Sequence, residues 1–242
     1  MDFFSSVSRL FFDLGILSWD VLLTLSNLVR RSRRIRHVTP EGHPGYGGYW
    51  PEYRPPKETD SRCSCPALNA MANHGKATAR ITFDLEELDL HSGIEHDASL
   101  LCLNAAFQPD QSIKHVPFIE ELLAAATGKD KDGNDLITTK DLSRMLGKRR
   151  AVARAVTRSS RTASSTRSLG ARITVFGGRV DDLRSFLLHE RIPESWESRI
   201  RQPYGLTLMT FNKTILGVEF GVCEQDWAEA AREAVERHTA PT

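Results

Sequence analysis

A cysteine stands directly before a predicted helix at residues 66–74. Pro66 suits the first position of that helix, because its missing N–H has no helical partner there. Cys65 is then the N-cap residue, where the amides of Ala67 and Leu68 point back at its sulfur and the helix dipole favours the thiolate. An axial haem ligand or a nucleophilic cysteine requires such a thiolate. A buried structural cysteine near a helix start shows the same pattern, so the motif alone leaves the role open.

A second polar cluster follows at residues 95–99. Glu95, His96, Asp97 and Ser99 place oxygen and imidazole donors close together in the chain. Such donors bind a hard divalent cation together with an external carboxylate or phosphate. Acidic residues of this kind also cap helix N-termini, which is the alternative interpretation of the triplet.

The cysteines indicate neither a disulfide scaffold nor a zinc site. Cys63, Cys65, Cys102 and Cys223 are too few and too scattered for a disulfide framework. One residue separates the first two, whereas zinc knuckles use two, and no second Cys/His pair completes a zinc site.

The order of these motifs resembles one protein family. The haem-thiolate peroxidases (the fungal chloroperoxidase and unspecific peroxygenase family) carry Pro-Cys-Pro, then Ala-Leu-Asn-x-x-Ala-Asn-His-Gly, and later Phe-Asp-Leu, Glu-His-Asp with Ala-Ser-Leu, and Glu-Arg-Leu-Pro. The corresponding stretches here are residues 64–66, 67–75, 83–85, 95–100 and 190–196. The chain therefore resembles this family over about residues 60–200. The resemblance implies a mainly α fold, a single helical haem-peroxidase-like domain of the chloroperoxidase type.

The resemblance also implies roles for both clusters. Cys65 would be the proximal thiolate ligand to the iron of haem b, and its electron push would favour cleavage of the O–O bond of hydrogen peroxide. Glu95, the backbone oxygen of His96 and Ser99 would hold Mg²⁺ or Mn²⁺ against a haem propionate. The catalytic residues would be His96, which orients the distal acid–base glutamate, and Asp97, which holds the His96 loop. The partners would be hydrogen peroxide and a small organic substrate, and the protein would be a monomer.

Two departures from the family pattern indicate a shortened or divergent member. Only residues 76–82 separate the helix motif from Phe-Asp-Leu, where the family has some tens of residues. The distal glutamate would fall near Ser168, and no acidic residue lies between Asp141 and Asp181. The predicted function is therefore a peroxidase or peroxygenase, with fungal secondary metabolism of aromatic polyketides as its hypothetical setting. The alternative is a catalytically impaired, membrane-tethered haem-binding or scaffold protein of the same fold.

Composition divides the chain into three parts. We expect an N-terminal hydrophobic anchor with a basic flank at residues 1–37, a Pro/Gly-rich hinge at 38–60, and the haem domain at 61–242. Residues 3–29 are long and apolar enough to cross a bilayer. Their polar positions share one narrow face at about 100° per residue: Arg9, Asp13, Asp20, Thr24 and Asn27. A spanning helix, an interfacial amphipathic helix and a helix packed on the protein's own core all stay open.

The charge distribution favours a membrane-associated protein whose domain lies in the cytosol. Lys and Arg number 32 against 31 Asp and Glu, so the total charge gives no reason to expect nucleic-acid binding. A basic tract at residues 30–36 directly follows the apolar helix, which places the rest of the chain on the cytosolic side. A second acid-free basic stretch, residues 144–179, has no aromatic residue before Phe176 and is interpreted as containing a solvated loop.

Most of the domain shows apolar residues at helical spacing. Helices are predicted at residues 66–74, 84–91, 97–107, 116–127, 139–156, 180–190 and 226–238. Alternation and β-branching predict two short strands within residues 205–221. Residues 130–141 partly match a calcium-binding EF-hand loop, but the sixth position is Asp135 instead of glycine. A solvated turn capped by Asp and Asn is the favoured interpretation.

Overall fold

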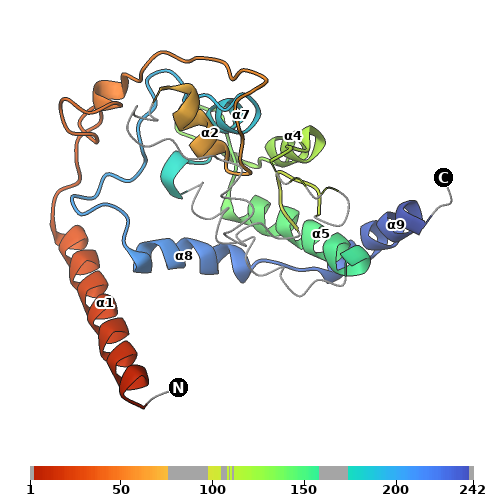
Figure 1. Cartoon of the computed structure of the whole chain (residues 1–242), viewed down its shortest axis with the longest axis horizontal. Coiled ribbons are helices and arrows are strands. Elements are labelled where there is room, and N and C mark those ends of the chain that lie inside the picture. Colours follow the sequence, from red (N-terminus) through yellow and green to blue (C-terminus); the bar gives the residue numbers. More distant parts are fainter. Residues whose placement is uncertain are drawn as a thin grey trace.

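Helices are the main regular secondary structure in the described part of the chain in the computed structural model (Figure 1). The structure describes residues 3–75, 98–104, 108, 110, 112–157 and 174–239. The helices are α1 (Phe3–Val29), α2 (Pro66–Asn73), α4 (Val116–Ala124), α5 (Thr139–Thr157), α7 (Val180–Leu188), α8 (Leu208–Glu219) and α9 (Ala228–Thr239), with 3₁₀ turns η1 (Tyr46–Gly48) and η3 (Gln225–Trp227). The strands β1 (Gly128–Lys129) and β2 (Asp135–Leu136) form an antiparallel hairpin. The prediction of a mainly α fold is therefore confirmed.

Helix α5 is the element around which the C-terminal helices pack. It contacts α8, α9 and η3, while α4 and α2 both pack against α7 (Figure 1). The main hydrophobic core lies where these helices meet. Its fully buried side chains are Leu101, Ile119, Leu122, Ile137, Leu142, Leu146 and Val218. Burial of such apolar side chains is the principal force that holds the helices together.

A smaller aromatic core lies under α2. It joins Ala70 of α2 to Phe186 of α7 and to Ile192 and Trp196 in the segment that follows α7. The rings of Phe186 and Trp196 meet edge to face, with their centroids 5.2 Å apart, and such pairs add to the free energy of burial. This core fixes α2 against α7, so it also fixes the cysteine that precedes α2.

The start of α5 is defined by a buried carboxylate. Asp141 accepts hydrogen bonds from the backbone N–H and hydroxyl of Thr138, at 2.8 Å each, and from the N–H and hydroxyl of Thr127. Burial alone would raise the pKa of Asp141, but these hydrogen bonds outweigh it and hold the pKa below its ordinary value. Thr138 Oγ1 in turn accepts the N–H of Asp141 at 3.3 Å, so the two residues cap the helix start reciprocally.

The EF-hand alternative is not supported by the turn between β1 and β2. Oδ1 of Asp130 accepts the N–H groups of Asp132 and Asn134, each at 2.9 Å. The Asn134 side chain is the largest of several influences that hold the pKa of Asp130 below its ordinary value. Asp135 pairs with Lys129 across the hairpin. These carboxylates stabilise the turn itself, in agreement with the favoured interpretation of a turn capped by Asp and Asn.

Two secondary-structure predictions are wrong where the structure describes them. Residues 208–219 form helix α8 instead of two strands, because Thr207 caps the helix and accepts the N–H of Thr210. Residues 98–104, the described part of the helix predicted at 97–107, form bends. The helix predicted at 84–91 and most of the basic Ser/Thr-rich loop lie outside the described residues.

Helix α1 extends away from the body of the molecule, and α8 begins beside it (Figure 1). Among the described helices, one segment, Val7–Val29, is long and apolar enough to cross a membrane, and 6% of its most apolar window is buried. The Pro/Gly-rich segment that follows has no α-helix, as predicted, and it packs on the domain. Trp50 Nε1 donates to the carbonyl of Trp196 at 2.8 Å.

Candidate functional site

Cys65 is the N-cap residue of α2, and Pro66 opens the helix, as the sequence predicted. The carbonyl oxygen of Cys65 accepts the N–H groups of Leu68 and Asn69 at 3.1 and 3.2 Å. Its thiol makes no capping hydrogen bond, so the prediction that the amides of Ala67 and Leu68 hold the sulfur is wrong. The Leu68 amide is occupied by the carbonyl instead. Cys65 is half-buried, and its thiol forms no disulfide bond.

The loop before Cys65 is held by a buried side chain of α2. Asn69, 1% exposed, accepts the N–H of Cys63 at 3.2 Å and donates to the Cys63 carbonyl at 2.8 Å. Its Nδ2 also donates to Oε1 of Glu190, again at 2.8 Å. One amide thus connects the Cys63–Cys65 loop, the helix and the segment after α7. The position of the Cys65 sulfur depends on all three.

The next two polar residues of the same motif bind the segment after α7. Asn73 donates to the carbonyl of Glu190 at 3.1 Å. His74 Nδ1 lies 2.6 Å from the carbonyl of Pro51, while its Nε2 accepts the N–H of Ile192 at 3.1 Å. A carbonyl can only accept, so the Nδ1 atom carries the proton of this ring. The motif therefore joins α2 to two distant backbone segments.

Glu190 lies at the centre of this corner and is 7% exposed. Its carboxylate is 3.2 Å from Lys114 Nζ, which also donates to the carbonyl of Leu188 at 3.1 Å. Glu190 has a φ of 48°, in the left-handed region that is unfavourable for residues other than glycine. The hydrogen bonds to Asn69 and Asn73 compensate for this strain. We refer to Cys63, Asn69, Asn73, His74, Lys114 and Glu190 as the Cys65 corner.

Of the predicted Mg²⁺ or Mn²⁺ ligands, Ser99 is the one that the structure describes. Its Oγ accepts the N–H groups of Leu101 and Cys102 at 3.1 and 3.2 Å. A hydroxyl oxygen has two acceptor positions, so both are used by this turn. Glu95, His96 and Asp97 lie outside the described residues. Within the described residues, no three His, Cys, Asp or Glu side chains come together as a metal site.

A buried guanidinium lies beside the Ser99 turn. Arg149 of α5 is 5% exposed, and its Nε donates to the carbonyl of Ser99 at 2.8 Å. Its Nη2 donates to Asn104 at 3.3 Å, and its guanidinium lies 3.8 Å from the centre of the Phe118 ring. Burial, and then the charge of Arg149, lowers the pKa of His115. The turn that carries Ser99 is thus fixed to α5 by a permanent positive charge.

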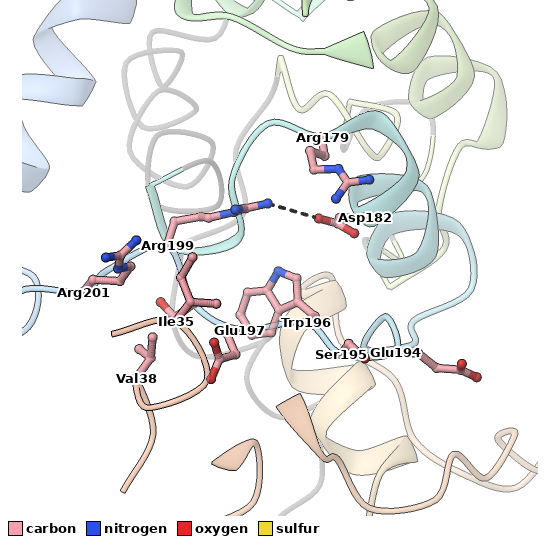
Figure 2. Close-up of a pocket in the computed structure, with 11 residues that line it drawn as sticks. Ile35, Val38, Arg179, Asp182, Glu194, Ser195, Trp196, Glu197, Arg199 and Arg201 are labelled. Carbon is pink, nitrogen blue, oxygen red and sulfur yellow. Dashed lines mark ion pairs between the residues drawn. The ribbon is translucent and has the colours of Figure 1, made fainter. Parts of the chain in front are cut away.

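Figure 2 shows a pocket of about 290 Å³ at the start of α7. Asp182 lies 3.7 Å from Arg199, and burial raises the pKa of Asp182 although Arg179 and Arg199 oppose the shift. A second pocket, of about 360 Å³, lies beside His74. Cys65 lines neither pocket.

Sequence reasoning missed the residues that hold Cys65 in place. The Glu-Arg-Ile-Pro stretch identified Glu190 as part of the family pattern but gave it no partner. Lys114 and Arg149 had no signal at all, because each pairs with groups that are remote in the chain. A buried charged residue becomes recognisable only when its partners are known.

The comparison with known families matches the part of the chain that contains the Cys65 corner. The chain matches the family described as "Peroxidase, family 2" over residues 51–78 and 76–201, more than half of its length. A search of curated proteins finds no match. The matched region contains Cys65, α2, the Ser99 turn and the segment after α7. The chain belongs to peroxidase family 2.

Proposed function

We propose that the protein is a haem-thiolate peroxidase or peroxygenase that oxidises a small organic substrate with hydrogen peroxide. The observation that carries the proposal is the state of Cys65. It is a free, half-buried thiol at the N-terminus of α2 with no capping hydrogen bond to its sulfur. A helix N-terminus stabilises a negatively charged ligand atom. The donor therefore fits the proximal position of a haem iron.

The chain's own residues would hold that donor still. Asn69 fixes the backbone of Cys63 and the carboxylate of Glu190, so the Cys65 loop cannot shift without breaking buried hydrogen bonds. Lys114 balances the charge of Glu190. Haem b, when bound, would supply the iron centre that activates the peroxide. The corner would keep the sulfur at a constant position during that chemistry.

We also propose the Mg²⁺ or Mn²⁺ site, but with Ser99 left out of its ligands. Glu95 and the carbonyl of His96 would bind the cation, and Asp97 would hold the His96 loop. Ser99 does not fit as a ligand in the present arrangement, because its hydroxyl accepts two backbone amides. It would join the site only by releasing one of them.

The distal acid–base glutamate distinguishes an active enzyme from the impaired alternative. The segment around Ser168 has no carboxylate in the sequence and lies outside the described residues. Loss of a general acid–base group costs about 10²- to 10⁴-fold in rate. We therefore propose slow turnover, assisted by His96. A haem-binding protein without turnover is the second candidate, favoured by the same missing carboxylate.

The test is spectroscopic and uses the full chain supplied with haem. A thiolate-ligated haem gives a red-shifted Soret band as its ferrous carbon monoxide complex, and we expect that band from the wild type. Cys65→Ala should abolish the band, whereas the matched control Cys223→Ser should retain it. Cys223 is also half-buried but lies after α8, away from α2. A wild type without the band, or an unchanged Cys65→Ala variant, would refute the proposal.

Oxidation of a phenolic dye by peroxide then distinguishes the two candidates. Turnover that depends on Cys65 supports the peroxidase. A protein that shows the Soret band but no turnover is the impaired haem-binding or scaffold protein. Both assays run on the same sample, so the absence of turnover cannot be mistaken for the absence of haem.

We further propose that residues 3–29 attach the protein to a membrane with its domain in the cytosol, and that it acts as a monomer in fungal secondary metabolism. The basic tract after α1 supports this orientation. Deletion of the gene should change the metabolite profile of the host, with loss of an oxidised aromatic product. An unchanged profile would contradict the metabolic role.

A further inference from the structure

The polar face of α1 is used to hold α8. Oδ1 and Oδ2 of Asp20 accept the backbone N–H groups of Leu208 and Met209 at 2.7 and 2.9 Å, and Asp20 is 9% exposed. These amides belong to the first turn of α8, where no helical carbonyl can reach them. A carboxylate from α1 therefore caps a helix that lies far along the chain.

Other polar residues of that face extend the contact. Thr24 Oγ1 lies 2.8 Å from the hydroxyl of Thr207. Asn27 donates to the carbonyl of Gly205 at 3.2 Å and accepts the N–H of Tyr204 at 3.1 Å. We call these interactions, together with those of Asp20, the α1–α8 contact. It occupies three of the four polar positions in the last ten residues of α1, and Ser26 is the fourth.

The rest of α1 is apolar and exposed. Every residue from 8 to 19 is exposed, and Phe11, Phe12 and Trp19 have exposed fractions of 70%, 69% and 64%. Arg9 and Asp13 lie in this part, on the same helical face as Asp20. The helix therefore presents a wide apolar surface and one narrow polar strip along its whole length.

Helix α8 adds a second exposed apolar stripe. Met209, Leu216 and Phe220 lie at helical spacing, with exposed fractions of 48%, 49% and 85%, and the cation Lys213 lies on the same side. The N–H groups of the first turn point along the helix axis, so the axis of α8 is aimed at Asp20 on α1. Two helices whose axes nearly meet share a plane. One flat surface touches both helices when their exposed apolar faces lie on the same side of that plane.

The length of α1 decides how it can meet a lipid bilayer. With residues 20–29 held by the domain, residues 3–19 remain, and at about 1.5 Å per residue they extend about 26 Å. The hydrocarbon core of a bilayer is about 30 Å thick. A spanning helix would also bury Arg9 and Asp13, and a charge at mid-bilayer costs several kcal/mol. The α1–α8 contact therefore disfavours a spanning orientation of α1.

We propose that α1 lies in the plane of an anionic membrane surface and that the exposed face of α8 lies on the same surface. This proposal rests on the membrane attachment proposed above. The strip that carries Arg9 and Asp13 would face the headgroups. The exposed arginines Arg30, Arg31 and Arg34, with Lys213, would meet the anionic lipids. The protein would thus be monotopic, with both ends of α1 on the cytosolic side.

The orientation is tested with an epitope tag at the N-terminus of the full chain, synthesised in the presence of microsomes. An in-plane helix leaves the tag open to added protease without detergent. A protected tag would show a spanning helix and would overturn the proposal. The matched variant Asp13→Leu/Asp20→Leu removes both acids and the α8 cap, so its tag should become protected.

The role of α8 is tested by co-sedimentation with vesicles of phosphatidylcholine and phosphatidylserine. Burial of one large apolar side chain is worth about a tenfold change in partition, so Phe220→Asp should weaken binding about tenfold. Tyr49→Asp, at a residue 76% exposed in the segment before α2, is the control and should bind as wild type. Unchanged binding of Phe220→Asp would overturn the placement of α8.

The two proposals can fail separately. A wild type that sediments with neither anionic nor neutral vesicles overturns the membrane attachment, and the in-plane orientation with it. A wild type that binds vesicles but protects its tag overturns only the orientation. Neither result bears on the Soret band, which reports on the ligation of haem by Cys65.

Discussion

The Cys65 corner and the α1–α8 contact both hold a helix with polar side chains, but at different depths. At the corner, Asn69, Asn73 and His74 are at most 4% exposed and bind backbone from three parts of the chain. At the other contact, Asp20 is the one buried residue among the described side chains of α1, and the others are half-buried or exposed. The Cys65 corner is part of the core. The α1–α8 contact is a joint between two helices on the surface of the protein, and we refer to it below as the joint.

This difference predicts different responses to the loss of one side chain. A buried polar group that loses its partner costs about 1–3 kcal/mol, because water cannot replace the bond. At the corner, several such groups depend on one amide, so the whole domain should lose stability. At the joint, water can reach the released amides, so the effect should stay local. The predictions below test this contrast.

Asn69→Ala should have the largest effect. It removes the hydrogen bonds of the Asn69 amide to the N–H and carbonyl of Cys63 and to the carboxylate of Glu190. We expect a loss of about 3 kcal/mol in the free energy of unfolding, measured by urea denaturation of the full chain in mild detergent. Met71→Ala, on the exposed side of the same helix, is the control and should cost less than about 0.5 kcal/mol. Equal effects of the two variants would show that the corner is not a buried network.

The sequence was sufficient for the helices whose burial follows from their own periodicity. α2, α4, α5, α7 and α9 all lie within a few residues of their predicted ranges, because their apolar faces are set by local spacing. Cys65 was placed correctly at the start of α2, since Pro66 marks a first helical position.

The sequence was insufficient where the partner is distant. Residues 208–219 contain Thr, Ile and Val, which favour strands, yet Asp20 caps this segment as a helix from 188 positions away. Glu190 likewise meets Asn69 across 121 positions. A single sequence carries no record of such pairs. The thiol of Cys65 also lacks the predicted amide contacts, because the first turn closes on its carbonyl instead.

Asp141→Ala should have the next largest effect on the free energy of unfolding. Its expected size lies between those for the Cys65 corner and the α1–α8 contact. Asp141 is 3% exposed and, like Asp20, binds backbone N–H groups at the start of a helix, but that helix is its own. We expect a loss of about 2 kcal/mol in the free energy of unfolding at neutral pH. Asp135→Ala, at an exposed pair with Lys129, is the control and should cost less than about 0.5 kcal/mol.

The pH dependence of that loss has a definite sign. The folded pKa of Asp141 is below the unfolded value of about 3.9, so its stabilisation is complete above that pH and disappears as the pH falls through the folded pKa. The difference between wild type and Asp141→Ala should therefore narrow below about pH 4. A difference that grows on acidification would contradict the assignment of Asp141 as an ionised cap.

Asp20→Ala should act on the joint alone. Loss of a helix cap costs about 1 kcal/mol, which is about a fivefold change in local opening. Hydrogen exchange of a peptide covering residues 205–212 should accelerate by that factor, while the urea midpoint of the domain stays unchanged. Asp13→Ala, on the same face of α1 but exposed, is the matched control and should leave the exchange as in wild type. A shift of the urea midpoint in Asp20→Ala would place the joint within the core.

Thr24→Val should have the smallest effect, because Thr24 reinforces a contact that Asp20 already makes. Its hydroxyl lies 2.8 Å from that of Thr207, which also bonds that of Thr210 at 2.9 Å, so Thr207 keeps a partner when Thr24 is lost. Valine preserves the shape of the side chain, and a single partly exposed hydrogen bond is worth about 0.5 kcal/mol. The exchange of residues 205–212 should therefore rise only about twofold. If Thr24→Val accelerates exchange as much as Asp20→Ala does, the joint depends on the whole polar strip, and α1 would detach from α8 as one unit instead of through the loss of a single cap.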